Sequence, residues 1–121
     1  MKARDAWFDL VELAVRTGRW KIVVDPRSFP PSSWKGTTFY DARAIVLRLK
    51  KHKTQEDLEV TLWHEMIHAA FRLVETSSEE DKKEEYRITT VLEKEYRKLS
   101  ESRKEIVRRM LKQAKRKPYH G

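Results

Sequence analysis

The chain has 121 residues, of which 39% are hydrophobic and 38% are charged, and its formal net charge is +8 at pH 7. This length suits one domain, and the hydrophobic content is sufficient for a core, which excludes a wholly disordered chain. Cysteine is absent, which excludes disulfides, thiolate metal sites and a cysteine nucleophile. No stretch is long and apolar enough for a membrane span, and acids interrupt residues 1–15 where a signal peptide would be apolar. We therefore expect a soluble, cytoplasmic protein without a membrane partner.

The polar composition is skewed toward charged side chains. Asn is absent, Gln occurs only at positions 55 and 113, and Lys, Arg and Glu supply most of the charge. This bias is typical of proteins that work at high temperature. A thermophilic origin is therefore expected.

The first half of the chain predicts one helix and two strands. Residues 4–16 are expected to form a helix that ends at Gly18; its inner face would comprise Trp7, Leu10, Val11, Ala14 and Val15. Residues 20–24 form a β-branched run, and Pro and Gly residues then indicate an irregular loop to about Thr37. Residues 43–49 alternate in a second strand, which we expect at the edge of a small sheet.

The second half predicts three helices. Thr54 begins a helical pattern that continues to about Val74, and Ser77 with Glu80 forms a capping box for the next helix. That helix would bury Ile88, Val91, Leu92, Glu95 and Leu99. Ser100 or Ser102 would begin the last helix, with Ile106, Val107, Met110 and Leu111 inside. The order of elements predicts an α+β fold.

The helix after Thr54 carries the motif His64-Glu65-Met66-Ile67-His68. The i, i+4 spacing places His64 and His68 on one face, where both imidazoles can bind one zinc ion. Glu65 then projects beside the ion, where its carboxylate can act as general base. Apolar neighbours such as Leu62, Trp63 and Ile67 indicate a helix packed on the core. The sequence therefore predicts a Zn²⁺ site.

A catalytic zinc needs a third protein ligand. A third His at the spacing of the extended motif would fall at Val74, so a carboxylate from the start of the following helix is the economical alternative. Helical facing leaves Glu84 and Glu85 beside the inner stripe of that helix, and it favours Glu85 with Glu84 as the alternative.

These features resemble the gluzincin metallopeptidases, and most of all their minimal form, the minigluzincins. The resemblance covers about residues 7–99, with His64, Glu65 and His68 as its specific part. It implies a minimal zincin-like domain over residues 1–99, with an N-terminal backing helix, a small sheet, the motif helix and a glutamate helix. Residues 100–121 would add a basic C-terminal helix and tail, either within the same domain or as a regulatory appendage.

The resemblance also implies hydrolysis of a peptide or protein substrate. Glu65 would deprotonate a zinc-bound water that attacks the peptide carbonyl, and would then pass the proton to the leaving amine. The expected edge strand at residues 43–49 could hold an extended peptide through backbone hydrogen bonds. Four candidates remain for the group that stabilises the oxyanion: Tyr86, Arg87, Tyr96 and His120.

The end of the chain is strongly basic. Residues 100–121 contain eight Lys and Arg against two Glu, which leaves a net charge of +6. The ordinary expectation is a solvated helix face with a frayed end. One alternative is self-inhibition, since small gluzincins can be held latent by a C-terminal segment, with His120 as a fourth ligand. The other is a nucleic-acid contact, which would make the chain a zincin-fold binding or regulatory protein.

Two other families of zincin-like proteins are less similar to the sequence. SprT-like proteins, which act on DNA-linked substrates, use a third His, and the chain has none between Ala69 and Tyr119. Regulatory peptidases of the ImmA type use a carboxylate ligand, but no Ala-Asn dipeptide follows the candidate glutamates. The oligomeric state is not indicated by the sequence.

Overall fold

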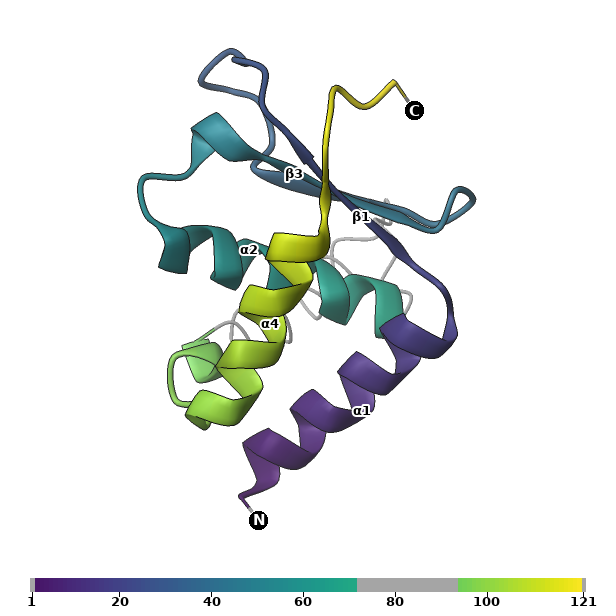
Figure 1. Cartoon of the computed structure of the whole chain (residues 1–121), viewed down its shortest axis with the longest axis vertical. Helices are drawn as coiled ribbons and strands as arrows, with labels where there is room; N and C mark the ends of the chain where they lie inside the picture. Colours follow the sequence, from purple (N-terminus) through teal and green to yellow (C-terminus); the bar gives the residue numbers. More distant parts are fainter. Residues whose placement is uncertain (1, 72–93, 121) are drawn as a thin grey trace, which may run out of the picture.

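The computed structural model describes residues 2–71 and 94–120. These residues form helices and a small mixed sheet (Figure 1), which confirms the predicted α+β class. In chain order the elements are α1 (Ala3–Thr17), β1 (Lys21–Asp25), β2 (Gly36–Phe39), β3 (Ala44–Arg48), the 3-10 helix η1 (Leu49–Lys51), α2 (Gln55–Phe71), α4 (Glu101–Gln113) and β4 (Lys115–Arg116). No helix in this part of the chain has the length and apolar character needed to cross a bilayer.

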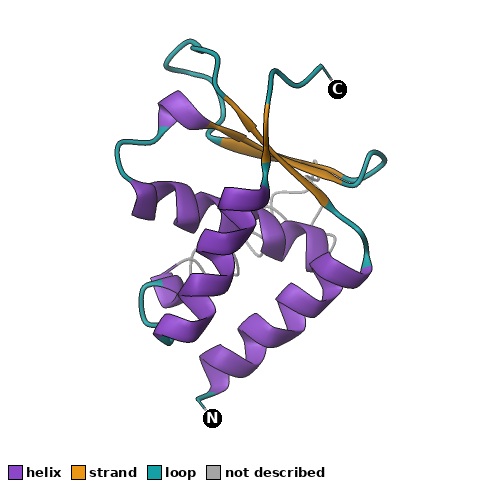
Figure 2. Cartoon of the chain, viewed as in Figure 1, coloured by secondary structure: helices purple, strands orange, loops and turns teal. Residues whose placement is uncertain are grey.

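The four strands lie in the order β2-β3-β1-β4. The central strands β1 and β3 are parallel, with Ile22 opposite Ile45, while β2 runs antiparallel to β3 and β4 runs parallel to β1. Helices α1, α2 and α4 all lie on one side of this sheet (Figure 2). The core forms between the sheet and these helices, because Ile45 and Leu47 pack with buried side chains of α2.

The second predicted strand is present as β3, but its expected place at the sheet edge is wrong. β3 lies between β1 and β2, and every residue from Ala44 to Leu47 is buried. The continuous apolar run of β3 therefore matches a strand in the interior of the sheet, buried along Ala44–Leu47. The edge strands are β2 and β4, and β2 begins at Gly36 inside the segment that the Pro and Gly content assigned to a loop.

The inner face of α1 differs from the prediction. The helix buries Phe8, Val11 and Val15, whereas Trp7 and Leu10 are 48% and 61% exposed. Helix periodicity defined a broad apolar stripe, and packing of Phe8 against the Trp63 ring on α2 selected which part faces inward.

Helix α1 ends at Gly18, as predicted, for a steric reason. A Cβ at Gly18 would lie 2.9 Å from both the Ala14 carbonyl oxygen and the Trp20 ring. The positive φ of 57° falls on the next residue, Arg19. The glycine therefore permits close approach of Trp20.

The start of α2 is the predicted one. The Thr54 hydroxyl accepts a hydrogen bond of 3.1 Å from the Asp57 amide, which satisfies one free donor of the first turn. The predicted continuation to about Val74 and the helix beginning near Ser77 lie outside the described residues. At the end of the latter prediction, Leu99 is buried, and Glu95 forms an ion pair of 3.0 Å with Arg4.

The C-terminal segment is part of the sheet, so the expectation of a frayed end is wrong. Val107 and Leu111 of α4 join the core, and β4 then pairs with β1. Beyond β4, the Lys117 amide donates to the Val24 carbonyl at 3.2 Å. The tail can pair with β1 because α4 ends beside that strand.

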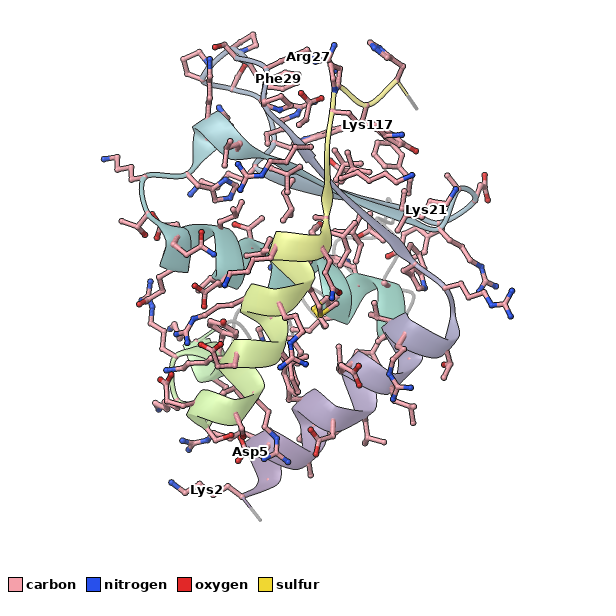
Figure 3. The ribbon with its side chains drawn as sticks, in the orientation of Figure 1. Lys2, Asp5, Lys21, Arg27, Phe29 and Lys117 are labelled. Atoms are coloured by element: carbon pink, nitrogen blue, oxygen red, sulfur yellow. The ribbon has the colours of Figure 1, made fainter. Side chains whose placement is uncertain are left out.

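The buried carboxylate of Asp25 secures the tail. Its Oδ2 accepts hydrogen bonds from Arg27 Nη2 at 2.8 Å and from the Tyr119 amide at 3.1 Å. These donors, chiefly the Arg27 side chain, hold the pKa of Asp25 far below its ordinary value. Figure 3 shows Arg27 and Lys117 close to each other at this end of the molecule.

Candidate metal centre

The predicted zinc motif lies on one well-packed helix. Leu62, Met66 and Ile67 of α2 are fully buried, while His64 and His68 are half-buried on a different face of the same turns. The core therefore holds the backbone of the motif and leaves both imidazoles within reach of solvent.

The two imidazoles converge. His64 Nε2 and His68 Nε2 lie 3.1 Å apart, and the ring centroids are 4.8 Å apart. A tetrahedral zinc ion with Zn–N bonds of about 2.0 Å would separate two ligand nitrogens by about 3.3 Å. The observed distance fits such a pair of ligands with little movement of either ring.

Glu65 completes a group of three side chains. One candidate ligand atom from each of His64, Glu65 and His68 lies within 4.8 Å of the others. Glu65 is only 6% exposed, so its carboxylate is withdrawn from bulk solvent next to the imidazoles. The donor set of two nitrogens and a carboxylate suits a divalent metal ion, although these residues alone do not identify which one.

The edge strand β2 approaches this group closely. A Cβ at Gly36 would lie 2.9 Å from Thr61 Cγ2 and 3.2 Å from Glu65 Cγ, so a larger side chain would push β2 away from α2. Gly36 is therefore needed for contact between the edge strand and the glutamate. The sequence marked this glycine only as a loop residue.

Two hydroxyls fasten the same edge to the motif. Thr38 Oγ1 donates to the Glu65 carbonyl and Tyr40 Oη donates to the His68 carbonyl, each at 3.2 Å. Gly36, Thr38 and Tyr40 alternate along the chain, which brings them to the face of the strand that meets α2. Sequence reasoning missed all three, and a β-rich Gly-Thr-Thr-Phe-Tyr run after the prolines was the available signal.

His52, which follows β3 and η1, forms a hydrogen bond with α2. Its Nδ1 donates to the Arg48 carbonyl at 2.9 Å, which leaves Nε2 to accept from the Thr61 hydroxyl at 2.7 Å. Burial lowers the pKa of His52 below its usual value. The neutral ring is therefore favoured. His52 links the Arg48 carbonyl to Thr61, which lies one turn before His64 on α2.

The candidate third ligands, Glu84 and Glu85, lie outside the described residues, as do Tyr86 and Arg87. Tyr96 is buried, and its hydroxyl donates to Glu59 Oε1 at 2.6 Å. Burial, followed by this contact, raises the pKa of Tyr96 well above its ordinary value. Its hydroxyl is thus engaged in a core contact with Glu59, on a different face of α2 from His64 and His68.

The structure does not bring His120 to the imidazole pair. The preceding Tyr119 ring packs on Phe39 with centroids 5.0 Å apart. Phe39 alternates with Thr38, which faces α2, so Phe39 and Tyr119 lie on the opposite face of the sheet. His120 is exposed beyond this contact.

No protein-family model matches the chain, and no match was found among curated proteins or solved structures. Function must therefore be inferred from the chemistry of the site.

Proposed function

We propose that this chain is a zinc-dependent peptidase with a minimal, gluzincin-like catalytic domain. The observation that carries the proposal is the convergence of His64 Nε2 and His68 Nε2 to 3.1 Å beside the buried Glu65. His64 and His68 would hold the ion, with Glu85 or, alternatively, Glu84 as the third ligand. When bound there, zinc acts as a Lewis acid that polarises a carbonyl and makes water more acidic.

Glu65 is the proposed general base. Its carboxylate takes a proton from the attacking water as the water oxygen bonds to the peptide carbonyl carbon. When the C–N bond breaks, Glu65 returns the proton to the leaving nitrogen, so that water and peptide yield a carboxylic acid and an amine. The low exposure of Glu65 supports this role, because a withdrawn carboxylate has fewer competing water contacts.

The edge strand β2 is the proposed support for the substrate. It ends the sheet on the side of β3, and it contacts α2 at Glu65 through Gly36 and Thr38. An extended peptide that pairs with β2 would run past Glu65 and the imidazoles. This arrangement favours polypeptides over small amides as substrates.

Metal analysis and peptide cleavage together test the proposal. Purified wild type should contain about one zinc ion per chain by mass spectrometry of the elements, and His68→Ala should lose it. Glu65→Gln should keep the zinc and lose at least about a hundredfold in peptide cleavage followed by chromatography. Wild type that binds no zinc after reconstitution, or full activity in Glu65→Gln, would overturn the proposal.

A further inference from the structure

Helices α1 and α4 are in contact near their N-termini and diverge toward their C-termini. Near their N-termini, Arg103 Nη2 pairs with Asp9 Oδ2 at 2.8 Å, and the Ser100 amide donates to Asp5 Oδ1 at 3.3 Å. Figure 1 shows the two helices spreading from this end toward β1, and Figure 3 labels Asp5 where they meet. A groove of about 540 Å³ opens between their C-terminal halves and β1.

The groove has an apolar floor. Six apolar residues line it: Val15, Trp20, Ile22, Ile106, Met110 and Ala114. The α4 wall presents Ile106, Arg109, Met110 and Gln113, which follow the i, i+3, i+4, i+7 spacing of one helix face. Ile106 and Met110 are only partly buried, so the groove leaves apolar surface that a partner could cover.

Arg109 gives this groove an exposed cation, and further bases follow Arg109 along the chain. Arg109 and Lys112 on α4 are exposed, as are the following bases Lys115, Arg116 and Lys117. Within residues 2–71 and 94–120 none of these five forms an ion pair, whereas Arg108 pairs with Glu105 and Glu101. On the opposite wall, Arg16 pairs with Glu12 at 2.9 Å. The surface therefore combines apolar contact area with an excess of cations.

We propose that this groove binds an acidic, amphipathic segment of a partner protein. Apolar side chains on one face of such a segment would cover Ile106 and Met110, and a carboxylate on its flank would meet Arg109. A nucleic acid fits less well, because Trp20 is the one aromatic ring among the lining residues described and most of the floor is aliphatic.

This partner site is separate from the metal-binding group. None of the groove residues belongs to the set of His64, Glu65 and His68. The inference therefore holds whether or not the chain is a peptidase. In a peptidase, the same groove would recruit a protein at a distance from the bond that is cut.

A library of random 16-residue peptides displayed on phage, selected on the full chain, tests the proposal. Enriched peptides should carry Asp or Glu together with apolar residues at i, i+3, i+4 and i+7 spacing. In fluorescence anisotropy, Arg109→Glu should weaken binding of the enriched peptide about tenfold, since a cation that lines the groove becomes an anion. The control Lys53→Glu changes the net charge equally at an exposed position outside the groove, and it should change binding less than about twofold.

Two further measurements separate the alternatives. Met110→Glu should also weaken binding of the enriched peptide about tenfold, because it places a charge on the apolar floor. If a thermal melt shows that Met110→Glu does not fold, Arg109→Glu alone decides. A 20-nucleotide single-stranded DNA is titrated in parallel. Any of three outcomes would overturn the proposal. They are the absence of enriched acidic peptides, equal effects of Arg109→Glu and Lys53→Glu, and tighter binding of the DNA than of every enriched peptide.

Discussion

The Thr38 hydroxyl donates a hydrogen bond of 3.2 Å to the backbone carbonyl of Glu65, and so joins the edge strand to the centre of the metal-binding motif. Thr38→Val removes this donor and keeps the side-chain shape and strand propensity. We expect the free energy of unfolding, measured in urea, to fall by about 1 kcal/mol. Thr37→Val is the matched control, because residue 37 faces away from α2; an equal loss in both variants would contradict the assignment.

Which carboxylate completes the zinc site can be decided by metal content. Glu85→Ala should abolish stoichiometric zinc, and Glu84→Ala should retain it, since removing one of three protein ligands greatly lowers affinity. Both variants change the charge equally, so each is the control for the other. Retention in Glu85→Ala with loss in Glu84→Ala would transfer the role to Glu84, and retention in both would exclude this pair.

Asp25 should make the fold sensitive to acid. Because the pKa of Asp25 is lowered, mainly by Arg27, its stabilising effect is present above the unfolded pKa of about 3.9 and is lost as the pH falls below it. Asp25→Asn should cost about 2 kcal/mol at pH 6 in urea unfolding. This difference should begin to shrink below about pH 4 and disappear only well below pH 3, because the folded carboxylate stays ionised there. The exposed Asp41→Asn should have little effect at either pH.

His52 should give a second pH dependence near neutrality. Burial lowers its pKa, so the unfolded chain takes up a proton near pH 6.5 that the folded chain resists. The free energy of unfolding should therefore fall as the pH decreases through about 6.5, and fall less steeply in His52→Gln. The exposed His120→Gln should keep the wild-type slope; the same slope in wild type and His52→Gln would contradict this role.

Tyr96 is expected to stabilise the fold without contributing to catalysis. Tyr96→Phe removes the hydroxyl that donates to Glu59 and leaves Glu59 its ion pair with Arg108 at 3.3 Å. The free energy of unfolding should fall by about 1–2 kcal/mol, while zinc content and peptide cleavage at a permissive temperature remain as in wild type. A large loss of cleavage at unchanged stability would return Tyr96 to the oxyanion candidates.

The sequence by itself determined the local elements and the motif. Helix periodicity and the Thr54 cap identified α2, and the four-residue spacing of His64 and His68 placed both on one face because each helical turn takes 3.6 residues. The Gly18 stop and the strand at β3 also follow from local preferences. The α+β class needed no more than the order of these elements.

Only the tertiary structure decided how these elements meet. Strand order depends on pairing between distant segments, so periodicity could not show that β3 is internal and that β2, beginning at Gly36, forms one edge of the sheet. The same is true of the pairing of β4 with β1 and of the groove beside it. Sequence spacing defines which residues share a face, but packing selects the face that is buried, as Phe8 rather than Trp7 shows on α1.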